Sequence, residues 1–141
     1  MKIAITSAGP TLDSQVDPRF GRAQYLLIVD TDSLDVEAID NPNVAAGGGA
    51  GIQTAQMVAA KGAQAVLTGN CGPNAFRTLN AADIQIYTNV SGAVRDAIES
   101  LKRGVLQPIS GPSVGGHFGA GGVGGQANPP AEDDITSSDG R

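Results

Sequence analysis

The sequence predicts one α/β domain in which helices cover a mixed five-stranded sheet, followed by a tail without regular structure. Short apolar runs of strand length alternate with segments whose apolar residues recur at helical spacing. The second and third strand candidates are separated only by a short turn, which favours a hairpin in a sheet that is parallel elsewhere. Glycine and proline gather in the last part of the chain, where apolar periodicity is nearly absent.

Five strands and three helices are expected in the order β-β-β-α-β-α-β-α. The continuous apolar run YLLIVD is typical of a central strand, and the turn TDSL joins it to the weaker strand DVEAID. The strands are expected at residues 2–6, 25–30, 35–40, 64–68 and 84–88.

The three helices are expected at residues 50–62, 73–82 and 91–104. Gly62 ends the first of them, and Pro73 opens the second at a position where a missing N–H costs nothing. Ser91 is expected to cap the third helix, which Gly104 ends after two basic residues.

The composition divides the chain into a domain at residues 1–103 and a flexible, acidic, Gly/Pro-rich tail at residues 104–141. The tail holds ten of the 20 glycines and four of the 8 prolines. It cannot bury enough apolar surface to offset the entropy of ordering it.

Charge and composition exclude several classes of function. The formal net charge is -5 and no basic run exists, which argues against a nucleic-acid partner. No window approaches the roughly 18 apolar residues of a membrane span, so no membrane partner is expected and a cytoplasmic protein is predicted. The single cysteine excludes an internal disulfide framework.

Three loops carry the functional signal: VDPRFGRA, NVAAGGGAG and TGNCGPNAF. The second and third place glycines before a helix, where exposed backbone N–H groups and the helix dipole attract anions. Such loops lie at the carboxyl ends of strands, where open α/β sheets bind ligands. Arg19 and Arg22 of the first loop would add full positive charge if that loop folds over the same edge. The residues alone therefore predict an anion site.

The identity of the anion and the role of Cys71 stay open at this level. The glycine loop lacks the Lys-Ser/Thr of a P-loop and the acidic residue of a dinucleotide site. A cysteine nucleophile needs a base, and the sole histidine, His117, lies in the tail. Cys71 is either a thiolate whose pKa the helix start lowers or a small residue packed under the loop. Arg19 either contacts the ligand or pairs with Asp13 or Asp17.

In combination the motifs resemble a known family. The segments MKIAI, VDPRFGRAQYLLIVD, GGGAG and TGNCGPNAFRTLNAADIQIY occur in this order within residues 1–103. They are similar to the dinitrogenase iron–molybdenum cofactor-binding family, the nitrogenase-accessory-like small proteins. The resemblance implies a ribonuclease-H-like three-layer fold, and it implies P-loop ATPases of the cluster-carrier type as partners. It also implies an anionic metal–sulfur cluster: the iron–molybdenum cofactor or its precursor in some members, and a molybdenum–copper sulfide cluster held non-covalently in others.

One departure from the family pattern bears on the ligand. Nitrogenase-linked members typically place a histidine directly before the Phe-Gly of the first loop, and here that position is Arg19. Arginine cannot ligate a metal at neutral pH, but it pairs with anions. This favours electrostatic holding of a molybdenum-containing sulfide anion over metal ligation.

A binding or carrier protein without enzymatic activity is therefore expected. The candidate cluster-binding residues are Arg19, Phe20, Arg22, Gly48, Gly49, Gly51, Asn70, Cys71, Gly72 and Pro73. Cys71 is also a candidate metal ligand, because its soft thiolate suits copper. Two alternatives stay open: a protein–protein interaction or regulatory domain without a cluster, and a phosphate- or nucleotide-binding module.

Overall fold

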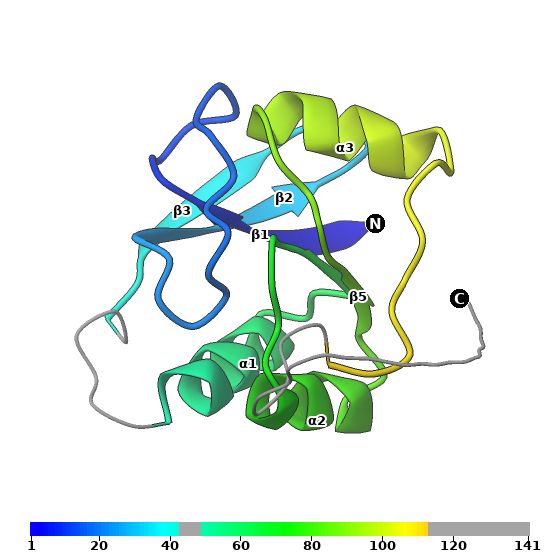
Figure 1. The fold of residues 1–141 in the computed structure, drawn as a ribbon. Helices are drawn as coiled ribbons and strands as arrows, with labels where there is room; N and C mark the ends of the chain where they lie inside the picture. Colours follow the sequence, from blue (N-terminus) through cyan, green and yellow to red (C-terminus); the bar gives the residue numbers. More distant parts are fainter. Residues whose placement is uncertain (43–48, 113–141) are drawn as a thin grey trace.

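The computed structural model describes residues 1–42 and 49–112. It confirms an α/β fold with a mixed five-stranded sheet and three helices (Figure 1). In chain order the elements are β1 (Lys2–Ser7), β2 (Tyr25–Asp30), β3 (Val36–Asp40), α1 (Ala50–Ala60), β4 (Ala65–Leu67), α2 (Pro73–Ala81), β5 (Gln85–Tyr87) and α3 (Val94–Lys102). The ribonuclease-H-like label stays a prediction.

The sheet has the order β3-β2-β1-β4-β5, with β1 at its centre. Strands β1, β2 and β3 pair antiparallel, so β2 and β3 form the predicted hairpin. Strands β1, β4 and β5 are parallel, with Ile5 opposite Leu67 in register. The carboxyl ends of these three strands therefore meet at one edge, together with the start of β2.

Both faces of the sheet are covered by helices. Helices α1 and α2 lie on one face and α3 lies on the other (Figure 1). Alternate residues of β1 serve the two cores: Ala4 packs with α1 and α2, whereas Ile3 and Ile5 pack with α3. Burial on both faces explains why the central strands are continuous apolar runs in the sequence.

Most of the predicted helix ends are correct, and one is not. Gly62 and Gly104 follow the last residues of α1 and α3 with φ of 77° and 74°, a conformation that glycine adopts without strain. Pro73 lies in the first turn of α2. Ser91 does not cap α3, because the N-cap is Ala93 and makes no side-chain cap hydrogen bond.

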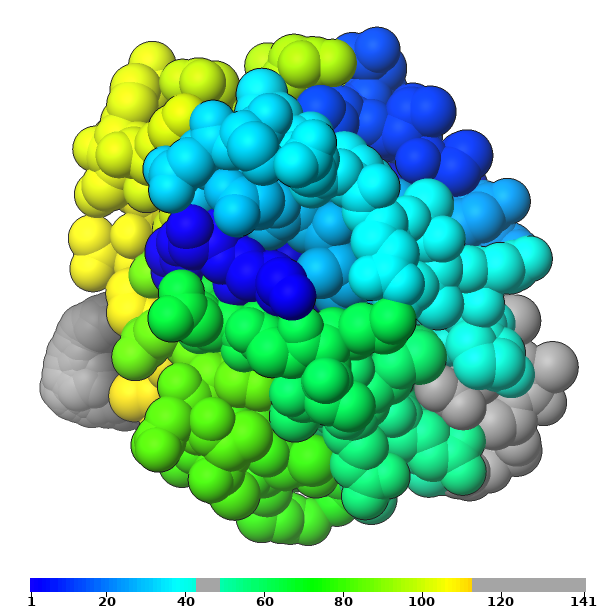
Figure 2. All heavy atoms as spheres, turned by 180° about the vertical axis from the view of Figure 1, so that it is seen from behind, coloured from blue at the N-terminus to red at the C-terminus, as the bar shows by residue number. Residues whose placement is uncertain are grey.

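The segment after α3 packs on the domain beyond the predicted boundary at residue 103. Pro108 forms an antiparallel bridge with Tyr87, and the N–H of Ile109 donates to the carbonyl of Ile86 at 2.8 Å. Ile109 also packs against the core on the α2 side. Figure 2 shows this segment in yellow along one side of the molecule. The rest of the predicted tail, with His117, lies outside the described residues.

Within the described part of the chain, no helix has the length and apolar character needed to cross a membrane.

Candidate anion-binding pocket

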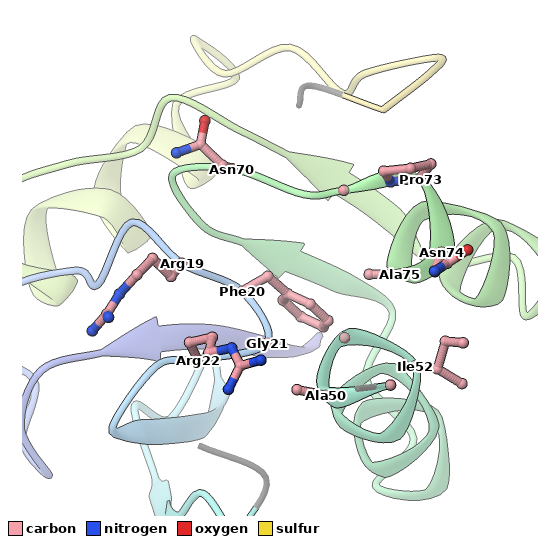
Figure 3. Close-up of a pocket in the computed structure, with 13 residues that line it drawn as sticks. Arg19, Phe20, Gly21, Arg22, Ala50, Ile52, Asn70, Pro73, Asn74 and Ala75 are labelled. Carbon is pink, nitrogen blue, oxygen red and sulfur yellow. The ribbon is translucent and has the colours of Figure 1, made fainter. Parts of the chain in front are cut away.

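The first and third predicted loops, together with the described residues 49–51 of the second, line one pocket. Its volume is about 450 Å³, within the range of roughly 300–1,000 Å³ typical of small-molecule sites. It opens between the first loop and the starts of α1 and α2 (Figure 3). The lining residues are Arg19, Phe20, Gly21, Arg22, Gly49, Ala50, Gly51, Ile52, Asn70, Gly72, Pro73, Asn74 and Ala75.

The first and third loops are joined by their backbones. The N–H of Asn70 donates to the carbonyl of Pro18 at 2.8 Å, and the backbones of Arg19 and Asn70 form an isolated parallel β-bridge. Gly69 packs directly on Pro18, since a Cβ at Gly69 would lie 2.5 Å from the Pro18 Cα. A larger residue at Gly69 would therefore separate the two loops.

Buried hydroxyl groups fix these loops to the sheet. Thr6 lies in β1 and Thr68 follows β4, both fully buried, and their Oγ1 atoms lie 2.8 Å apart. The Thr6 hydroxyl also lies 2.7 Å from the carbonyl oxygen of Asp17, which accepts a hydrogen bond from it. Because all three residues are buried, this polar contact is shielded from water and holds the first loop firmly.

Small residues bring the first loop and both helix starts together. A Cβ at Gly21 would lie 2.8 Å from the backbone nitrogen of Gly51 in the first turn of α1. A Cβ at Gly51 would in turn lie 3.3 Å from the Cβ of Ala75 in α2. Only glycine at the first position, and a small residue at the second, allow this close approach.

Two helix N-termini face the pocket, and neither carries a side-chain cap among the described residues. The N-cap residues of α1 and α2 are Gly49 and Gly72, and neither first turn contains an acidic residue. The first N–H groups of a helix have no partner within the helix and carry partial positive charge. The pocket therefore offers two converging sets of N–H donors to an anion.

The two arginines of the first loop differ in direction. Arg22 extends toward the start of α1, whereas the Arg19 side chain extends to the opposite side (Figure 3). The Nε and Nη2 atoms of Arg19 lie 3.3 and 3.4 Å from the two carboxylate oxygens of Asp17. The structure thus bears out the salt bridge to Asp17 that the sequence left open.

Apolar groups form much of the pocket wall. Phe20 is buried and belongs to the core beneath α1 and α2, and its ring points between the two helices (Figure 3). Ala50, Ile52, Pro73 and Ala75 add aliphatic surface. The pocket therefore combines N–H and guanidinium donors with apolar walls.

Cys71 does not line the pocket. It is fully buried in the core cluster that also contains Phe20, Ala75 and Leu79. Burial raises the pKa of the Cys71 thiol to about 11. Of the two alternatives left open by the sequence, this favours the small residue packed under the loop over the thiolate whose pKa is lowered. In the described residues, no group of three His, Cys, Asp or Glu side chains is placed to hold a metal ion. Metal ligation by Cys71 stays a prediction. The burial of this thiol outside the pocket lining argues against it.

The other predicted site residues are placed as follows. Arg19, Phe20, Arg22, Gly49, Gly51, Asn70, Gly72 and Pro73 all line the pocket, and Gly48 lies outside the described residues. Sequence reasoning missed Gly21, Ala50, Ile52, Asn74 and Ala75. These residues are neighbours of predicted residues in the same loops and first helical turns. Including every residue of the first turn after each glycine loop, and every residue between Arg19 and Arg22, would have found them.

The domain that carries this pocket is similar in sequence and in structure to several known proteins. The sequence model of the family described as dinitrogenase iron-molybdenum cofactor matches residues 1–104. The apo form of the orange protein from Desulfovibrio gigas is 41% identical, with a TM-score of 0.77 over 79% of this chain and 95% of that one. A Thermotoga protein described as a candidate NifB protein is 38% identical, with a TM-score of 0.67 over 76% and 91%. An uncharacterized protein of Methanocaldococcus jannaschii is 26% identical over 110 residues, covering 76% of this chain and 90% of its own.

Proposed function

The chain belongs to the dinitrogenase iron-molybdenum cofactor family, and from this membership we propose that it binds and carries an anionic molybdenum-containing metal–sulfur cluster. The cluster would lie in the pocket between the first loop and the starts of α1 and α2. A molybdenum–copper sulfide cluster and a related iron–molybdenum–sulfur cluster are the two forms that the proposal includes. The observation that supports the proposal most directly is that an arginine-bearing loop and two helix starts converge on one pocket, and that neither helix start has a side-chain cap from the described residues.

The donors in the pocket suit an anion. Backbone N–H groups at helix starts bind anions through fixed donors and the helix dipole, and they need no reorganisation to do so. Arg22 adds a full positive charge on the α1 side. Hydrogen bonds from such groups to cluster sulfurs are an established way in which proteins tune metal–sulfur clusters.

The walls of the pocket favour a weakly hydrated anion over phosphate. Phe20, Ile52 and Ala75 offer no hydrogen bonds, so a strongly hydrated oxyanion would lose water there without replacement. Sulfide sulfurs are larger and more polarizable than oxyanion oxygens and lose less on leaving water. The described residues that line the pocket include neither the lysine nor the hydroxyl group of a P-loop.

Binding and carriage without catalysis is part of this proposal. The polar groups of the pocket are N–H donors, amides and guanidinium groups, which hold a charge but do not exchange protons at neutral pH. Delivery of the cluster by P-loop ATPases of the cluster-carrier type stays a prediction from the family resemblance.

Titration of the purified full-length protein with tetrathiomolybdate, followed by a copper salt, tests the proposal. We expect visible charge-transfer bands that stay with the protein through desalting, with molybdenum and copper retained in a fixed ratio to protein. Molybdate serves as the matched anion, because it has the same charge and shape with oxygen in place of sulfur. We expect molybdate to be lost on desalting.

Two variants separate pocket binding from adsorption. Arg22→Gln removes the charge on the α1 side and should weaken retention of the anion. Arg95→Gln removes an exposed arginine of α3, on the other face of the sheet, and should not. Equal retention by both variants, or retention of ATP in preference to the thioanion, would refute the proposed function.

A further inference from the structure

We propose that Arg19 does not contact the anion but acts through Asp17, as a positioning residue that neutralises a buried carboxylate beside the pocket. This inference rests on the proposed function, because it assigns roles within the same site. It separates the two arginines of the first loop, which the sequence presents as equivalent.

Asp17 is a buried acid in the first loop, and it pairs with Arg19, which is one of the residues that line the pocket. Its side chain is only 6% exposed, whereas the Arg19 side chain is 65% exposed. The Asp17 carboxylate accepts a hydrogen bond from the N–H of Arg19 at 3.0 Å, in addition to the two guanidinium contacts. Three donors from one neighbouring residue thus converge on this carboxylate.

The direction of the side chain agrees with this role. The guanidinium group of Arg19 extends away from the starts of α1 and α2, on which the N–H donors lie (Figure 3). A move into the pocket would break both of its contacts with Asp17 and leave a buried carboxylate without its cation. Such an exchange is costly, because an unpaired buried charge is far less stable than a paired one.

The pair also explains how an acid is tolerated at this position. An unneutralised carboxylate near the pocket would repel an anionic ligand through the weakly screening protein interior. Paired with Arg19, Asp17 contributes almost no net charge there. Its own backbone carbonyl accepts the buried Thr6 hydroxyl, and its N–H donates to the Thr6 carbonyl at 2.9 Å, so the residue fastens the first loop to β1.

A double-mutant cycle distinguishes this role from direct contact with the ligand. The variants are Arg19→Ala, Asp17→Asn and the two combined, and the probe is tetrathiomolybdate. Arg19→Ala alone should weaken binding by about tenfold, because it leaves Asp17 unneutralised. In the Asp17→Asn background the same substitution should change binding by less than about twofold.

Direct contact predicts the opposite pattern. If Arg19 binds the anion, its removal costs at least as much affinity in the Asp17→Asn background, where the guanidinium is no longer held by a carboxylate. A tenfold loss in both backgrounds therefore overturns the inference. The exposed pair of Arg95 and Asp13, whose Nε–Oδ1 distance is 3.2 Å, is the matched control. Its corresponding cycle should leave binding unchanged in every variant.

Thermal unfolding of the same variants without ligand gives an independent measurement. Arg19→Ala should lower the unfolding midpoint by about 5 °C, and the combined variant should recover most of that loss. Failure of the wild type to retain tetrathiomolybdate would refute the proposed function, whereas this unfolding cycle tests separately whether Arg19 neutralises Asp17. Recovery in the combined variant supports the neutralising role, and additive losses overturn it.

Discussion

Replacement of Gly72 by aspartate should make the protein more stable and a weaker anion binder at the same time. Gly72 is the N-cap of α2 with φ of -74° and ψ of 174°, a conformation open to any residue. A Cβ there would meet no described atom within 4 Å. Aspartate therefore fits without strain, and its carboxylate can accept the N–H groups that the glycine leaves uncapped.

The two effects have different sizes. Capping and the helix dipole together should raise the free energy of unfolding by roughly 0.5–1 kcal/mol, which is an increase of a few degrees in the midpoint. A carboxylate ~5 Å from a bound anion costs about 3 kcal/mol per unit of ligand charge at an effective dielectric constant of about 20. Because Gly72 is only half-buried and solvent screens part of the repulsion, we halve that value, which leaves a loss in affinity of at least about tenfold.

The assays are calorimetric unfolding and an absorption titration with tetrathiomolybdate. Ala93→Asp is the matched control, because Ala93 is the uncapped N-cap of α3 on the opposite face of the sheet. It should raise the unfolding midpoint without changing anion affinity. If Gly72→Asp stabilises the protein and binds the anion as tightly as the wild type, the α2 start is not part of the binding site.

The remaining predictions concern Cys71, Gly21 and Asp30. Cys71→Ser should keep cluster retention but lower the free energy of unfolding by about 1–3 kcal/mol, because it buries a hydroxyl in the apolar core; loss of retention in a folded variant would instead indicate ligation. Since burial raises the pKa of Cys71 from 9.0 to about 11, its contribution to stability should be complete below pH 9.0 and lost as pH rises through about 11. Cys71→Ala should remove the pH dependence of the unfolding free energy that this thiol causes between pH 9.0 and about 11. Gly21→Ala should cost about 1–3 kcal/mol in unfolding free energy and weaken anion binding, because its Cβ would displace the backbone of α1; unchanged unfolding would contradict the packing. Backbone hydrogen bonds from Asp32 and Ser33 lower the pKa of Asp30 below 3.8, so wild type should lose stability relative to Asp30→Asn as pH falls through that lowered pKa.

The fold was accessible from the sequence because its signals are local. YLLIVD is buried on both faces as a strand between two others, and its apolar run predicted this directly. Gly62 and Gly104 end helices through a backbone conformation that favours glycine, so their positions were predictable as well. The cap of α3 was not, because Ser91 is a good cap by type, yet the chain enters that helix two residues later. That entry is set by tertiary contacts, including the hydrogen bond from the N–H of Val94 to the Ser14 carbonyl.

The pocket was partly predictable for a related reason. Glycines before helices and the arginines of the first loop showed which loops would meet. The carboxyl ends of parallel strands lie at one edge of a sheet, so the loops that follow them lie close together. Which side chain faces the pocket depends on packing that no local pattern encodes. Cys71 lies between two pocket residues in sequence but turns into the core. Arg19 and Arg22 look alike in sequence, and the structure separates them by the direction of their side chains and by the ion pair of Arg19 with the buried Asp17 carboxylate.

The strand-like contact of Pro108 and Ile109 with β5 has a consequence for where the protein can be shortened. The family match ends at residue 104, but the outer backbone edge of β5 is occupied by residues beyond it. Truncation at residue 104 would expose that edge, together with apolar surface that Ile109 covers. An open strand edge pairs readily with other chains, so the shortened protein should self-associate. The unit recognised by family similarity is therefore smaller than the unit whose β5 edge is covered, and the difference lies in a few residues after α3.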